Sequence, residues 1–130
     1  MNDNTFTILL IEDEDFISNM IARSLRDEGY QVITTSDLKS SLIVLDTGAI
    51  DLVISDVMLP FTGGLDVVDY IHGHEELEGT PIILVTGIDK DVLETSSVLV
   101  DAIFPKPFDM NELVDKVDEL LGRRQTAEGY

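Results

Sequence analysis

The sequence is poor in three things: cysteine, basic residues and long apolar runs. Without cysteine, the 130-residue chain has neither disulfides nor thiolate chemistry, which suits a reducing compartment. Its apolar runs are only as long as a strand, far short of the roughly 20 residues that cross a bilayer. The first residues, MNDNTF, lack the basic segment of a signal peptide. These absences predict a cytoplasmic protein with no membrane partner.

The charge balance is one-sided, with 26 acidic residues against 8 basic ones and a formal net charge of −18. A charge of this sign and size argues against direct binding to the phosphate backbone of nucleic acids. It suits a basic patch on a protein partner, although composition alone does not identify one. Most of the carboxylates must be solvated, and a few are candidates for holding a cation.

Short apolar segments alternate with amphipathic ones, and no repeat or low-complexity segment interrupts them. The apolar segments read as buried strands, and the amphipathic ones have apolar residues at helical spacing. The predicted strands lie at 5–11, 30–34, 52–54, 82–85 and 100–104, and the predicted helices at 16–29, 38–48, 65–77, 89–98 and 109–121. This alternation predicts an α/β domain at residues 1–122, a doubly wound five-stranded parallel sheet flanked by five helices, with a polar tail at 123–130.

Residues suited to capping lie near several predicted helix ends. From the first helix to the last, the candidates are Asp13 or Asp15, Ser36 or Asp37, and Asp109 in a capping box with Glu112. His72 and His74 fall in the last turns of the helix at 65–77, where a cation suits the helix dipole. We expect a surface or capping role for both histidines.

Polar side chains follow four of the predicted strands, at the point where each strand ends. Glu12 and Asp13 follow the first strand, Asp56 the third, Thr86 the fourth and Lys106 the fifth. Because the carboxyl ends of parallel strands meet at one edge of a sheet, these side chains can converge in the crevice where open α/β sheets bind ligands. Asp56 on its own could equally be an ordinary loop aspartate, and the polar residues at the other strand ends favour a site.

Three carboxylates at one place would repel one another unless a cation neutralised them. A hard, oxygen-seeking ion such as Mg²⁺ fits carboxylates combined with a backbone carbonyl and waters. A lysine and a threonine hydroxyl at the same edge suit the oxygens of a phosphoryl group. The strand ends therefore predict a divalent-metal site next to a place for a phosphoryl group.

Four short motifs together resemble the receiver domain of two-component response regulators, the CheY family. They are the ED pair after the first strand, DVMLP with Gly64 after the third, TG after the fourth and KPF after the fifth. The resemblance implies that Asp56 accepts a phosphoryl group from a histidine kinase or a phosphotransfer protein. It also implies that Thr86 and Lys106 contact the phosphoryl oxygens and that the Lys106–Pro107 bond is cis.

The same resemblance implies how the metal is held. Asp13, Asp56 and the backbone carbonyl of Met58 would bind Mg²⁺, and Glu12 would act mostly through water. The domain would signal to a downstream protein through the face formed by the helix at 89–98, the strand at 100–104 and the helix at 109–121. A phosphorylation-dependent dimer would use this face as well.

Two residues depart from the family pattern. Ile103 stands three positions before Lys106, where the family usually has an aromatic side chain that swings inward on activation. Phe104 does not replace it, because alternation along a strand points Phe104 to the opposite face. Pro105 removes a backbone donor, which is tolerated mainly on an edge strand or at a strand's end. We expect the chemistry of phosphorylation to be intact. We do not expect the usual inward swing of an aromatic side chain on activation.

Two alternative functions stay open. A Mg²⁺-dependent phosphatase or phosphotransferase of the haloacid-dehalogenase type also forms an aspartyl phosphate, but its nucleophile follows the first strand in a DxD pattern, where this chain has EDED. The complete acidic set argues against a receiver fold kept as an unphosphorylated docking scaffold, whereas Ile103 keeps that alternative open. The leading hypothesis is a phosphoacceptor that assists its own phosphorylation and dephosphorylation and is not otherwise an enzyme.

Overall fold

The computed structural model describes residues 5–56, 65–87 and 99–122. In chain order the elements are β1 (Thr7–Ile11), α1 (Asp15–Asp27), β2 (Gln31–Thr35), α2 (Leu38–Leu45), β3 (Leu52–Asp56), α3 (Leu65–His72), the 3₁₀ turn η1 (Glu75–Leu77), β4 (Ile82–Thr86), β5 (Ala102–Pro105) and α5 (Met110–Leu120). Strand bounds differ from the predicted ones by about two residues, the usual uncertainty at element ends. The predicted helix at 89–98 and the tail at 123–130 lie outside the described residues.

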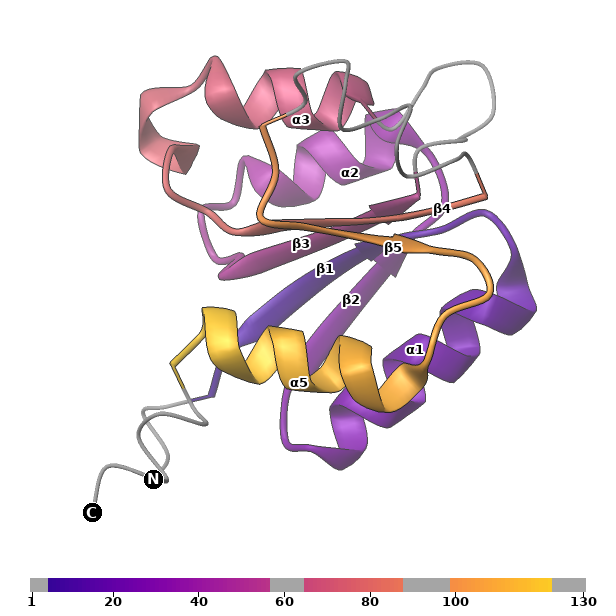
Figure 1. The fold of residues 1–130 in the computed structure, drawn as a ribbon. Coiled ribbons are helices and arrows are strands. Elements are labelled where there is room, and N and C mark those ends of the chain that lie inside the picture. Colours follow the sequence, from indigo (N-terminus) through magenta and orange to yellow (C-terminus); the bar gives the residue numbers. More distant parts are fainter. Residues whose placement is uncertain (1–4, 57–64, 88–98, 123–130) are drawn as a thin grey trace.

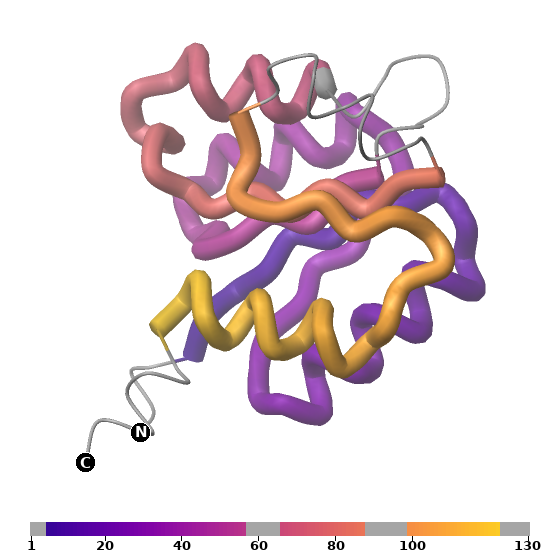
Figure 2. Tube along the Cα trace, viewed as in Figure 1, coloured from indigo at the N-terminus to yellow at the C-terminus, as the bar shows by residue number. Residues whose placement is uncertain are grey.

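The strands form one parallel sheet in the order β2-β1-β3-β4-β5, which confirms the predicted doubly wound architecture. Helices α1 and α5 cover one face of the sheet, and α2 and α3 cover the other (Figure 1). The tube in Figure 2 shows α1 and α5, far apart in sequence, side by side under the sheet, where they contact each other. Within the described residues, the sheet is therefore flanked by four α-helices and η1.

Two apolar cores fill the space between the sheet and its helices. The central strands β3 and β4 are buried along their whole length, as expected for strands covered on both faces. Alternate residues of a strand point to opposite faces, so Leu9 and Val53 belong to the core under α2 and α3, while Leu10 and Ile54 belong to the core under α1 and α5. None of the helices in the described part of the chain combines the length and apolar character needed to cross a bilayer.

The predicted helix at 65–77 was wrong in its extent, because α3 ends at His72 and η1 follows. Gly73 lies at the break, and glycine has a low helix propensity. Its N–H is shared between the carbonyls of Asp69 and Tyr70, at 2.9 and 3.2 Å. His72 is exposed and contacts the Leu99 carbonyl, and His74 stacks on Tyr70, so both lie at the surface as expected.

The structure distinguishes between the predicted caps. Asp37 caps α2 by accepting a hydrogen bond from the N–H of Ser40, so Asp37 and not Ser36 is the cap. Asp109 caps α5 by accepting from the N–H groups of Asn111 and Glu112. The prediction for α1 was wrong: Glu14 occupies its N-cap position, and within the described residues its side chain makes no capping bond.

Candidate functional site

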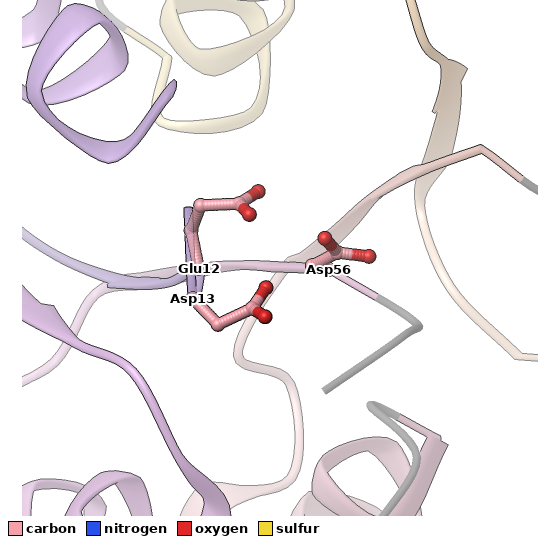
Figure 3. A group of neighbouring side chains, drawn as sticks. All are labelled: Glu12, Asp13 and Asp56. Atoms are coloured by element: carbon pink, nitrogen blue, oxygen red, sulfur yellow. The ribbon is translucent and has the colours of Figure 1, made fainter. Parts of the chain in front are cut away.

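Three carboxylates meet where the order of the strands reverses, between β1 and β3. Ile11 is in register with Ser55, so the residues that follow β1 lie beside the end of β3. One ligand oxygen from each of Glu12, Asp13 and Asp56 lies within 4.8 Å of the others. Figure 3 shows the group, with two side chains from the end of β1 and one from the end of β3. The sequence prediction that these acids converge is confirmed.

The three carboxylates differ in exposure. Glu12 and Asp56 retain only 3% and 4% of their accessible surface, and Asp13 is exposed. Buried carboxylates are costly unless they are paired, hydrogen-bonded or bound to a metal. An arrangement of two buried carboxylates and one solvent-facing carboxylate fits a hard divalent cation that keeps several waters. Glu12, Asp13 and Asp56 are therefore the described residues that could hold such an ion.

Among the described residues, Lys106 brings a positive charge to the site. Its Nζ donates to Oδ2 of Asp56 at 2.9 Å and lies 3.3 Å from Oε1 of Glu12. Strand β5 positions it: Thr86 is in register with Pro105, and the N–H of Lys106 donates to the Thr86 carbonyl at 2.7 Å. The ammonium thus lies between the two buried carboxylates, where the sequence placed it.

Burial and charge shift the pKa values of two groups here. Burial, reinforced by the charge of Asp56, raises the pKa of Glu12 to about 7, although the Glu14 N–H and Lys106 oppose the shift. For Lys106, burial by itself lowers the pKa, but the hydrogen bond to Asp56 and the charges of Asp56 and Glu12 outweigh it, so the pKa is raised overall. The surroundings therefore favour the ammonium form of Lys106 and the protonated form of Glu12.

The other predicted features of the site are Thr86, the carbonyl of Met58 and the cis bond between Lys106 and Pro107. Thr86 is fully buried at the end of β4, on the same edge of the sheet as Asp56, which pairs with its neighbour Val85. Met58, whose carbonyl is a predicted metal ligand, lies outside the described residues. The Lys106–Pro107 bond is cis, as the resemblance implied.

Sequence reasoning missed one residue of this cluster, Glu14. Its Oε1 lies 3.4 Å from Nζ of Lys106, and its N–H donates to Oε2 of Glu12 at 3.1 Å. The available signal was the run of acids that follows β1, EDED, in which only the first two positions were assigned to the site. The run gives no sign of which further carboxylate reaches the lysine.

Strand β5 carries the two departures from the family pattern. It is an edge strand of the sheet, and Pro105 is exposed at its end, where the missing N–H is tolerated. Ile103 packs against the core under α2 and α3, whereas Phe104 packs against the core under α1 and α5. The predicted opposite orientation of these two side chains is confirmed, so Phe104 does not take the position of the aromatic residue.

The chain matches the family model described as "Response regulator receiver domain" over residues 8–118. It is 34% identical over 123 residues to the transcriptional regulatory protein PcoR of Escherichia coli, an alignment that covers 92% of this chain and 53% of PcoR. The chain spans about half the length of the curated relatives it matches. The likeness therefore concerns one part of those longer proteins.

Solved structures of response regulators are also similar to this chain. The response regulator TrrA of Thermotoga maritima, described in complex with Mg²⁺–BeF, is 31% identical with a TM-score of 0.79, covering 89% of this chain and 99% of TrrA. The chemotaxis response regulator CheY4 of Vibrio cholerae, at 24% identity, shares the fold with a TM-score of 0.81, covering 89% of this chain and 98% of CheY4. With a family model that matches most of its length, the chain belongs to the response regulator receiver domains of two-component signal transduction.

Proposed function

We propose that this receiver domain accepts a phosphoryl group on Asp56 from a phosphohistidine of a histidine kinase or phosphotransfer protein. The observation that carries the proposal is the pairing of buried Asp56 with Lys106 at 2.9 Å, next to two further carboxylates. An Asp56 oxygen attacks phosphorus, so that an O–P bond forms as the N–P bond of the phosphohistidine breaks. The imidazole nitrogen keeps the electron pair of the broken bond.

The acidic cluster fits Mg²⁺ by its chemistry, since its donors are carboxylate oxygens alone. Asp13 and Asp56 would hold the ion directly together with the carbonyl of Met58, and Glu12 would act mostly through water. When bound, Mg²⁺ supplies positive charge that offsets the charge of the carboxylates and of the transferring group. The description of TrrA in complex with Mg²⁺–BeF supports this assignment.

Lys106 and Thr86 complete the site. The ammonium already lies beside the acceptor oxygen, so it offsets the negative charge of the incoming phosphoryl oxygens without a large movement. The Thr86 hydroxyl donates to one of those oxygens at the neighbouring strand end. The domain thereby assists its own phosphorylation and dephosphorylation, while the phosphohistidine comes from the partner.

The remaining parts of the proposal concern the setting. Residues 1–122 form the receiver domain in the cytoplasm, and residues 123–130 form a polar tail. The phosphorylated state signals to a downstream protein, or to a second copy of the domain, through the face that contains β5 and α5. The net charge of −18 directs the partner choice toward basic protein surfaces and away from nucleic acid.

Labelling with acetyl phosphate and Mg²⁺, followed by intact mass, tests the function. We expect one phosphoryl group per chain, sensitive to hydroxylamine, and none in Asp56→Asn, which removes the nucleophile with little change of volume. Asp69→Asn, at an exposed position of α3, is the matched control and should label normally. Continuous hydrolysis of the donor at an enzymatic rate would indicate the phosphatase alternative. Absence of labelling would indicate a docking scaffold, and native labelling of the Asn variant would mean that another residue is the acceptor.

A further inference from the structure

Glu14 reaches the catalytic lysine from the solvent side. Among the described residues, three carboxylates lie around Nζ of Lys106, and two of them, on Asp56 and Glu12, belong to side chains only 5% and 1% exposed. The third, on Glu14, lies 3.4 Å from Nζ in a side chain that is 60% exposed. The ammonium of Lys106 is therefore shared between the buried interior of the site and a carboxylate at its surface.

The position of Glu14 in α1 does not account for this contact. An N-cap side chain usually accepts a hydrogen bond from the first turn of its helix. Within the described residues, the Glu14 carboxylate makes no such bond. Its backbone N–H donates to Oε2 of Glu12, which holds the residue beside the acidic cluster. The carboxylate is thus available to Lys106 and not to the helix.

We infer that Glu14 is a positioning residue that competes with the incoming phosphoryl group for Lys106 and selects against small dianionic phosphodonors. This inference rests on the proposed function of Asp56. A donor must bring its phosphoryl oxygens to an ammonium that Glu14 already contacts, and it must approach a further negative charge while doing so. A monoanionic donor meets less repulsion than a dianionic one.

Acetyl phosphate is a dianion at neutral pH, and its reaction with Asp56 illustrates how Glu14 would compete with the phosphoryl group for Lys106. An Asp56 oxygen attacks phosphorus, the bond between phosphorus and the acetate oxygen breaks, and acetate leaves with the electron pair. No proton is required. As the phosphoryl oxygens approach, Lys106 must exchange its contact with Glu14 for contacts with them, and the freed Glu14 carboxylate then repels the group being transferred.

The test compares phosphorylation rates of the native chain and Glu14→Gln at saturating Mg²⁺, which removes any difference in metal affinity. The donors are acetyl phosphate and phosphoramidate, a monoanion. We expect Glu14→Gln to raise the acetyl phosphate rate constant roughly two- to fivefold, the size expected of one partly exposed charge pair. The phosphoramidate rate should rise less. Because Glu14 is exposed, the gain should shrink at high ionic strength.

Asp15→Asn is the matched control, since it removes an exposed charge from the next residue, which lies in the first turn of α1. It should change the rates less than Glu14→Gln does. A native chain that is labelled on Asp56, with Glu14→Gln equal to it or slower with acetyl phosphate, would overturn the inference and leave the proposed function standing. Equal gains with both donors, or from both variants, would also overturn it. A native chain that is never labelled would instead refute the proposed function.

Discussion

Glu12 shows how a single side chain responds to its surroundings. Its folded pKa of about 7 lies above its ordinary value of 4.5, because burial and the charge of Asp56 outweigh the Glu14 N–H and Lys106. The folded state therefore holds this proton more tightly than the unfolded chain does. The resulting stabilisation is complete below about pH 4.5 and is lost as the pH rises through about 7.

We predict that Glu12→Gln weakens the pH dependence of stability in the absence of metal. Between pH 5 and pH 8 the native chain should lose about 2 kcal/mol more unfolding free energy than the variant, since Gln carries no proton to lose. Urea unfolding in buffer with a chelator measures the difference. Glu78→Gln, at an exposed position, is the control and should retain the native dependence. Parallel curves for the native chain and Glu12→Gln would contradict the prediction.

The site residues were predictable to different degrees. Glu12, Asp13, Asp56 and Lys106 could be placed together because each follows a strand, and parallel strands bring their carboxyl ends to one edge. The contact of Glu14 could not be predicted, since it depends on where the start of α1 lies relative to the end of β5. In the sheet, β3 and β4 lie between β1, which precedes α1, and β5, and this arrangement leaves no periodic signal in the sequence.

At the scale of elements, apolar periodicity was sufficient to predict strands and helices but not their ends. Strands β3 and β4 are buried along their full length, and each begins with a continuous apolar run, LVI in β3 and IILV in β4, that is easy to recognise. The helix at 65–77 was predicted as one piece that ends at Leu77, a residue that is buried in η1. The break depends on Gly73, because glycine has a low helix propensity. The spacing of apolar residues carries no information about that propensity.

The N-cap of α5, Asp109, is expected to contribute to the stability of the fold. Asp109 satisfies two N–H groups of a helix that buries Leu113 and Val117, so its loss affects an element that contributes to the core. Asp109→Ala should lower the free energy of unfolding by about 1 kcal/mol. Asp109→Asn should retain most of the stability, because asparagine is an equally good N-cap. Chemical denaturation of both variants measures this, and equal losses would show that the capping bond is not the cause.

For the whole molecule, the arrangement of the sheet connects the site to a surface. Thr86 ends β4, which pairs with the edge strand β5, and β5 carries Ile103 on one face and Phe104 on the other. If Asp56 is phosphorylated as proposed, a movement of Thr86 toward the phosphoryl group would act on β5 directly. In the usual receiver scheme, an aromatic side chain at the position of Ile103 rotates into the space that the threonine vacates.

Isoleucine is unsuited to that rotation, since it is β-branched, stiff at χ1 and too short to exchange a buried for an exposed position. Ile103 packs against the core under α2 and α3. A ligand shifts a conformational equilibrium only through contacts that differ between the two states, so a side chain that stays packed in both contributes no coupling. Phosphorylation should consequently alter the region around Thr86 more than the surface near Ile103.

We therefore predict that Ile103→Tyr increases the effect of Asp56 phosphorylation on the conformation of β5. The rate of phosphorylation itself should remain nearly unchanged. Amide hydrogen exchange with and without Mg²⁺ and beryllium fluoride measures it: in the native chain the change should be small in β5, and in the variant it should be larger. Ile43→Tyr, at an exposed position of α2, controls for the added ring. If β5 of the native chain already changes strongly and Tyr adds nothing, the signal leaves the site by another route. The stiffness of Ile103 would then have no part in how a change at the site reaches β5.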